Sequence, residues 1–224
     1  MPSQSRPTIE LIIFDADGVL VDSEAIALEV LAEAARASGA EIANTEALSI
    51  FRGLKIADCV VEIERRASAK VASTFVDDVR TATALAFEAR LKPITGVRSA
   101  LAAINIPVCV ASNGPRAKLN QTLRLTRLHR RFGSYVYSAY EVGSWKPDPG
   151  LFLHAAAQFQ ADPSCCLVIE DSVPGVRAGK AAGMKVFGYA GGDSSVAEEL
   201  REAGATVFHD MFALPRMISD LSNG

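Results

Sequence analysis

Between Val19 and Lys92 the chain has no proline and only two glycines, Gly39 and Gly53. From Pro93 onward it has 13 glycines and 8 prolines, which separate short apolar runs. Glycine and proline interrupt regular elements and concentrate where the backbone turns. The two parts of the chain are therefore predicted to be built differently, one from long helices and the other from short elements joined by turns.

The proline-free part carries the periodicity of amphipathic helices, with apolar residues spaced three and four positions apart. These positions are Ile26, Val30, Leu31, Ala34 and Ala35 in one helix and Ile56, Val60, Ile63 and Ala67 in another. We expect a small helical bundle over residues 22–91.

The rest of the chain alternates short apolar runs with helix-like segments. The runs are Ile9–Phe14, Pro107–Ala111, Tyr135–Ser138, Cys166–Ile169 and Lys185–Tyr189. Runs that are apolar on both faces suit parallel strands covered by helices on each side. The prediction is a doubly wound parallel α/β core of residues 1–21 and 92–224, with the α-helical unit of residues 22–91 inserted after the first strand. Asn113, just before Pro115, is expected to cap the helix after the second run.

Composition excludes several classes of protein. The chain has 224 residues, is 49% hydrophobic and has a formal net charge of −3, which gives no general attraction to nucleic acid or to anionic membranes. No apolar stretch is long enough to cross a bilayer, and the first residues are too polar for a signal peptide. The four cysteines show no C-x-x-C spacing, which argues against a disulfide framework or a zinc site. We expect a cytoplasmic monomer with no membrane or nucleic-acid partner.

Polar side chains follow four of the apolar runs. The first run ends in Asp15-Ala16-Asp17-Gly18, the second in Ser112-Asn113 and the fourth in Glu170-Asp171, while Lys146 follows the third. In an open parallel sheet, ligands bind beyond the carboxyl ends of the strands. The sequence therefore predicts one crevice that gathers four carboxylates, two neutral hydrogen-bond donors and one ammonium group.

In this order, these residues resemble the four motifs of the haloacid dehalogenase superfamily, whose members are mostly phosphotransferases. The resemblance implies that Asp15 is a nucleophile that forms an aspartyl phosphate, a role that suits a group ionised at neutral pH. It implies that Asp17 is the general acid and base. Mg²⁺ would be held by the Asp15 side chain, the Asp17 backbone carbonyl and Asp171, with Glu170 as a second acidic candidate.

Positive charge and hydrogen-bond donors are needed as well, because a dianionic phosphate would meet several carboxylates. The resemblance assigns the fixed positive charge to Lys146. Ser112 and the Asn113 amide would donate hydrogen bonds to the phosphoryl oxygens. A catalytic set of Asp15, Asp17 and Lys146 follows.

Substrate choice is expected to lie in the helical unit, since the motif residues handle only the phosphoryl group. Arg52 and Lys55 flank Gly53 and either bind a carboxylate or hydroxyls of the leaving group, or belong to an exposed turn between helices. A basic cluster in residues 124–131 is interpreted as a solvated surface.

The inserted helical segment resembles the subgroup that contains β-phosphoglucomutase and many sugar phosphatases, and residues 110–115 and 144–149 are similar to 6-phosphogluconate phosphatase-like proteins. The resemblance implies an Mg²⁺-dependent phosphatase acting on a small phosphorylated sugar or sugar acid. Two alternatives remain: a sugar phosphomutase, disfavoured because such mutases usually carry a histidine where this chain has Ala27, and a non-catalytic sugar-phosphate-binding protein.

Overall fold

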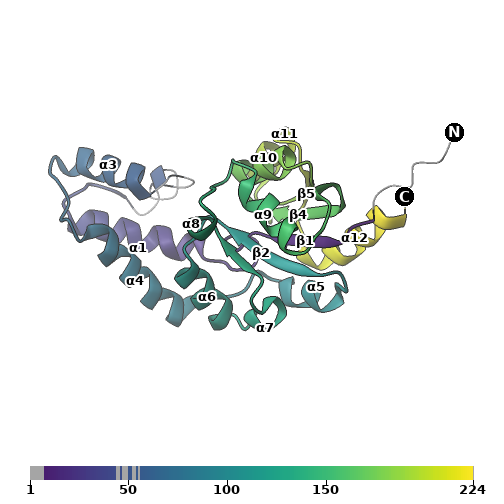
Figure 1. Cartoon of the computed structure of the whole chain (residues 1–224). Coiled ribbons are helices and arrows are strands. Elements are labelled where there is room, and N and C mark those ends of the chain that lie inside the picture. The colour runs from purple at the N-terminus through teal and green to yellow at the C-terminus, as the bar shows by residue number, and fades with distance from the viewer. Residues whose placement is uncertain (1–7, 44–45, 47–49, 52–53, 55, 224) are drawn as a thin grey trace. The chain divides into compact units, whose positions relative to one another are not determined.

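The computed structural model in Figure 1 describes residues 8–43, 46, 50–51, 54 and 56–223. The chain forms two compact units: one is Asp22–Lys92, and the other joins the residues up to Val21 to those from Pro93 onward. Lys92, predicted as the first residue of the returning core, belongs to the smaller unit. The chain leaves and re-enters the larger unit at one place, because Val21 and Pro93 form an antiparallel bridge.

The larger unit is built on a six-stranded sheet in the order β3-β2-β1-β4-β5-β6, in which all neighbours are parallel. The strands are β1 (Leu11–Phe14), β2 (Val108–Ser112), β3 (Val136–Ser138), β4 (Cys166–Glu170), β5 (Lys185–Tyr189) and β6 (Thr206–Phe208). Every residue of β1, β2 and β4 is buried, as expected of apolar runs at the centre of a parallel sheet. The predicted doubly wound α/β class is therefore confirmed.

Helices cover both faces of this sheet (Figure 1). One apolar cluster contains Ile13 of β1, Val168 of β4, and residues of α9, α10 and α11. Side chains alternate between the faces of a strand, so Phe14 points to the opposite side, where its ring packs edge-on against Phe132 of α7. The helices of this unit are α5 (Val97–Ala103), α6 (Arg116–Leu125), α7 (His129–Phe132), α8 (Ala139–Val142), α9 (Gly150–Gln158), α10 (Val173–Ala181), α11 (Ser194–Glu202) and α12 (Leu214–Asn223), with 3-10 turns η1 (Pro163–Cys165) and η2 (Met211–Ala213).

The described part of the smaller unit is helical, as its periodicity predicts. Its helices include α1 (Glu24–Ala37), α3 (Ile56–Ala67) and α4 (Phe75–Arg90). They share a core of their own, in which Leu31, Ala35, Phe51, Ile63 and Val79 are buried. None of the helices described in either unit is both long enough and apolar enough to span a membrane.

The predicted cap of the helix after β2 is wrong. This helix, α6, begins at Arg116 and receives no side-chain cap. The side chain of Asn113 instead bonds the backbone of Lys146 on another loop, accepting from its N–H at 3.0 Å and donating to its carbonyl at 3.4 Å. This pair of bonds ties the loop after β2 to the loop that carries Lys146.

Candidate functional site

The loop after β1 places two carboxylates at the carboxyl end of the sheet. The Asp15 N–H donates to the Ile169 carbonyl of β4 at 2.9 Å, so the backbone of Asp15 continues the pairing of the two strands. The loop then turns at Gly18, which has a φ of 75° and whose N–H donates to Val21 at 2.9 Å. A positive φ is accessible to glycine at no steric cost, which explains a glycine directly after Asp17.

Lys146 lies between two buried carboxylates. Its Nζ donates to Oδ1 of Asp15 and, at 2.6 Å, to Oε1 of Glu170. Asp15 and Lys146 are each 7% exposed and Glu170 is 0% exposed, so this ion-pair network is shielded from solvent. The ring of Phe152 adds a cation–π contact, with its centroid 4.9 Å from the ammonium nitrogen.

Burial and neighbouring charge shift the pKa values of this network. Burial raises the pKa of Asp15 to about 7; Lys146 opposes this shift, whereas Glu170 and Asp17 add to it. Burial alone would lower the pKa of Lys146, but Asp15 and Glu170 outweigh it and hold that pKa above its ordinary value. Lys146 is therefore a permanent positive charge beside a carboxyl that gains a proton readily.

Both oxygens of Glu170 already accept hydrogen bonds. Oε1 accepts from Lys146, and Oε2 accepts from the backbone N–H groups of Asp171 and Ser172 and from the Ser172 hydroxyl, at 2.9–3.1 Å. The carboxylate also fills the space beside Gly175, where an added Cβ would lie 1.9 Å from Glu170. Through these contacts Glu170 anchors Lys146. Direct binding of a metal ion by Glu170 stays a prediction.

Asp171 lies against the turn that follows Asp17. A Cβ built on Gly18 would lie 1.8 Å from Oδ2 of Asp171, so only a glycine leaves room for this carboxylate. The loop after β1 and the end of β4 are thereby brought into contact. Asp15, the backbone of Asp17 and Asp171 are all hard oxygen donors, which is the chemistry that Mg²⁺ requires.

Asp17 faces the turn after β2. The Cβ position of Gly114 lies 3.9 Å from Oδ2 of Asp17 and 3.5 Å from Oγ of Ser112. Ser112 is 2% exposed, and its hydroxyl accepts the N–H of Gly114 at 3.1 Å. The structure therefore places the two predicted elements, the acid-base carboxylate and the phosphate-binding turn, side by side.

Lys118 is a site residue that was not identified from the sequence. It lies in the first turn of α6, and its Nζ donates to Oδ2 of Asp17 at 2.8 Å. A signal was available, since the first helical turn after a strand of a parallel sheet lies at the ligand-binding edge. The contact with Asp17 could not be predicted, because the two residues lie 101 positions apart in the sequence.

A divalent cation fits the charges of this site. The site gathers four carboxylates, those of Asp15, Asp17, Glu170 and Asp171, and two ammonium groups. Lys146 binds Asp15 and Glu170, and Lys118 binds Asp17. Within the described part of the chain, no cluster of three or more His, Cys, Asp or Glu side chains forms a ready metal cage. A set of two aspartate side chains and one backbone carbonyl is compatible with that finding, because Mg²⁺ completes its shell with water and phosphate oxygens.

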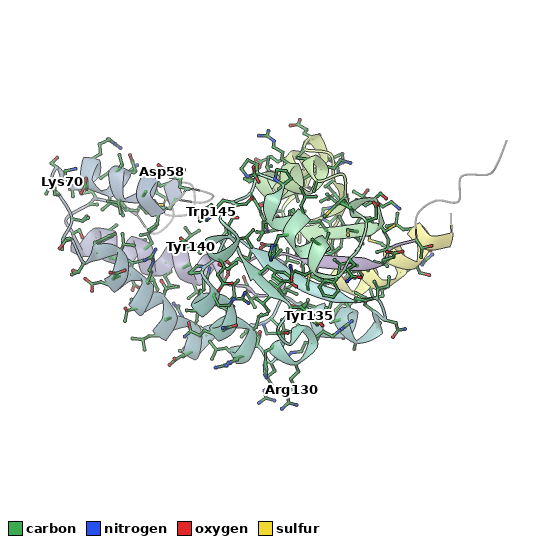
Figure 2. The ribbon with its side chains drawn as sticks, viewed as in Figure 1. Asp58, Lys70, Arg130, Tyr135, Tyr140 and Trp145 are labelled. Atoms are coloured by element: carbon green, nitrogen blue, oxygen red, sulfur yellow. The ribbon has the colours of Figure 1, made fainter. Side chains whose placement is uncertain are left out.

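Other predicted positions lie elsewhere. Arg52 and Lys55 fall outside the described residues. In the basic cluster of residues 124–131, Arg130 points away from the sheet in Figure 2. Arg131, by contrast, has a structural role, because its guanidinium donates to the carbonyls of Leu101, Ile104 and Ile106.

The fold and this arrangement of acidic residues define a doubly wound α/β protein with an acidic site at the carboxyl end of its sheet, and comparison with known proteins gives the family. Residues 9–183 match the haloacid dehalogenase-like hydrolases. The chain belongs to this family.

Individual relatives agree with this assignment. The chain is 33% identical over 180 residues to 6-phosphogluconate phosphatase of Escherichia coli K12, a match that covers 80% of this chain and 81% of the relative. A haloacid dehalogenase-like protein of unknown function from Agrobacterium tumefaciens has 36% identity and a TM-score of 0.85, over 96% and 99% of the two chains. A family hydrolase of Deinococcus radiodurans, crystallised with phosphate and sodium, has 29% identity and a TM-score of 0.80, over 96% and 97%.

Proposed function

We propose that the protein is an Mg²⁺-dependent phosphatase that hydrolyses a small phosphorylated sugar or sugar acid through an aspartyl-phosphate intermediate on Asp15. The single observation that carries the proposal is the buried ion pair between Asp15 and Lys146 at the carboxyl end of the sheet. It places a nucleophilic oxygen next to a fixed positive charge, and that charge favours the transfer of a negatively charged phosphoryl group to the oxygen.

In the first step, an oxygen of Asp15 attacks phosphorus and the bond from phosphorus to the substrate oxygen breaks. Asp17 gives its proton to the departing oxygen, so that an alcohol leaves. Ser112 and the backbone N–H of Asn113 donate to the phosphoryl oxygens, since the side-chain amide of Asn113 is engaged with Lys146. In the second step, Asp17 takes a proton from water and the water oxygen bonds to phosphorus. The bond from phosphorus to the Asp15 oxygen breaks, and its electron pair stays on that oxygen, which restores the carboxylate.

The negative charge of the site is the main obstacle to binding a phosphate dianion. A bound Mg²⁺, held by Asp15, Asp171 and the Asp17 carbonyl, would offset this charge and polarise a phosphoryl oxygen. Lys146 reduces the repulsion further and is kept in place by Glu170. In this proposal Glu170 positions Lys146.

The substrate class rests on the relatives. One is named a 6-phosphogluconate phosphatase, and a second, from Thermotoga maritima, is named a phosphorylated carbohydrates phosphatase. We assign substrate selection to the smaller unit, with Arg52 and Lys55 as the candidate contacts, because the motif residues bind only the phosphoryl group.

The test is phosphate release from a panel of phosphorylated sugars and sugar acids, by the wild type and by Asp15→Asn. The amide is a poor nucleophile, so turnover should fall by about 10⁴-fold or more. Chelation of Mg²⁺ should stop hydrolysis, and added Mg²⁺ should restore it. Isomerised sugar phosphate without free phosphate would instead identify a mutase, and tight binding without turnover would identify a non-catalytic binding protein.

A further inference from the structure

Lys118 contacts Asp17 but has no part in the two steps described above. Its ammonium donates to Oδ2 of Asp17 at 2.8 Å, and the two side chains are each 31% exposed. An ion pair with this much solvent contact contributes little to stability. Its place on the acid-base carboxylate points to a role in the reaction.

The backbone of Asp17 is fixed independently of Lys118. The N–H groups of Leu20 and Val21 both donate to the Ala16 carbonyl, and the N–H of Gly18 donates to Val21, so the loop is closed on itself on both sides of Asp17. The side-chain torsions of Asp17 are not set by these backbone bonds. The carboxylate reaches toward the turn at Gly114, and the first turn of α6, which follows that turn, brings Lys118 to the same place.

We propose that Lys118 is a positioning residue for Asp17: by holding Oδ2, it fixes the rotation of the carboxyl group so that Oδ1 carries the transferred proton and faces the departing oxygen. The inference rests on the proposed function and adds a residue to it. Lys118 acts through Asp17 and has no covalent role.

This role predicts a dependence on the leaving group. When the bond between phosphorus and the substrate oxygen breaks, the electron pair stays on that oxygen, which then takes the proton of Asp17. An alkoxide leaving from a sugar phosphate needs that proton, whereas nitrophenolate leaves p-nitrophenyl phosphate readily as the anion. Misplacing Asp17 should therefore slow transfer from the sugar phosphate far more than transfer from the aryl phosphate.

The experiment measures kcat/KM, which reports the steps up to release of the alcohol, for the full-length Lys118→Met and Lys118→Arg variants. The substrates are p-nitrophenyl phosphate and the sugar phosphate hydrolysed fastest in the panel. We expect Lys118→Met to lower kcat/KM for the sugar phosphate by about 30- to 100-fold and for the aryl phosphate by less than about 3-fold. Lys118→Arg should recover most of the loss, since it keeps a cation that can hold Oδ2. Lys180→Met, an exposed lysine of α10, is the matched control and should leave both values unchanged.

An equal loss on both substrates, or no loss on either, would overturn the inference, as would a failure of arginine to restore the difference. If Lys118→Met does not fold, Lys118→Leu removes the same charge and hydrogen-bond donor and gives the same comparison. Failure of the proposed function looks different, because the wild type would then release phosphate from neither substrate.

Discussion

At the scale of single residues, the main feature of the site is its charge balance, in which few positive charges lie among several carboxylates. Lys146 is shared between Asp15 and Glu170, and all three are buried. Removing one member of such a network leaves an uncompensated buried charge, which costs far more than the pair itself contributes. Asp15 is therefore expected to respond strongly to pH and to cations.

The raised pKa of Asp15 predicts a pH-dependent response to Mg²⁺. Its pKa is about 7 in the folded protein against an ordinary value of 3.8, so between these values the folded protein binds more protons than the unfolded chain. The contribution of Asp15 to stability is therefore complete below about pH 4 and is lost as the pH rises through 7. The proposed Mg²⁺ would bind the ionised form of Asp15, so the increase in thermal midpoint caused by MgCl₂ should be larger at pH 8 than at about pH 5.5.

Differential scanning calorimetry of the wild type and Asp15→Asn at the two pH values measures this effect. Comparison with the variant isolates the part of the Mg²⁺ effect that depends on the Asp15 carboxyl group. A midpoint increase that is the same at both pH values, or the same in Asp15→Asn, would contradict the prediction.

At the scale of elements, the start of α10 links stability to the site. The Ser172 hydroxyl accepts the N–H of Gly175 at 3.2 Å and donates to Glu170 at 2.9 Å, so one side chain caps the helix and supports the anchor of Lys146. The cap of α11 supports the helix without touching the site. There, Asp193 accepts from the N–H groups of Ser195 and Val196, at 2.9 and 3.2 Å.

Two cap deletions should therefore separate stability from activity. Ser172→Ala and Asp193→Ala should each lower the free energy of unfolding by about 1–2 kcal/mol. Only Ser172→Ala should also lower kcat, by about 10-fold, because Glu170 loses a hydrogen bond that orients it. Urea denaturation and steady-state kinetics measure the two effects, and equal kcat values for the two variants would show that the cap of α10 does not reach the site.

The elements also show how far the sequence could predict the structure. The apolar runs identify β1 to β5 because these strands are largely buried. No run predicts β6, because only one residue of Thr206–Phe208 is buried and the first is exposed. The sequence could place Asp15, Asp17 and Asp171 at the carboxyl end of the sheet because they closely follow β1 and β4. Lys146 lies on the loop between α8 and α9, after β3. The bonds of Asn113 to Lys146 and of Lys118 to Asp17 could not be predicted, because they join loops and helices far apart in the chain, and spacing along a sequence carries no information about such pairs.

At the scale of the whole molecule, the two units have separate cores. The buried cluster of the smaller unit consists of residues between Leu28 and Val79, and the cluster on β1, β2 and β4 consists of residues outside that range. The chain crosses between the units at a bridge of Val21 with Pro93 and a hydrogen bond of 3.0 Å from the Asp22 N–H to the Lys92 carbonyl.

This arrangement predicts that the larger unit folds without the smaller one. Replacing residues 22–92 by a short Gly-Ser linker should leave a protein that unfolds cooperatively in a thermal melt followed by circular dichroism, since the bridged ends need only a short connection. Hydrolysis of p-nitrophenyl phosphate should persist in part, while discrimination among sugar phosphates should be lost. A non-cooperative melt would show that the larger core needs the inserted residues to fold.

The backbone hydrogen bond from Asp15 to Ile169 means that substitutions inside the strands can disturb the site. Because Asp15, the proposed nucleophile, and the acidic end of β4 follow paired strands, the sheet register itself sets their spacing. A bulky replacement deep in β1 or β4, at Ile13 or Val168, could shift one strand along the other and move the two carboxylates apart. Activity would then be lost through a residue that never meets the substrate, and inspection of the crevice alone would not reveal the cause.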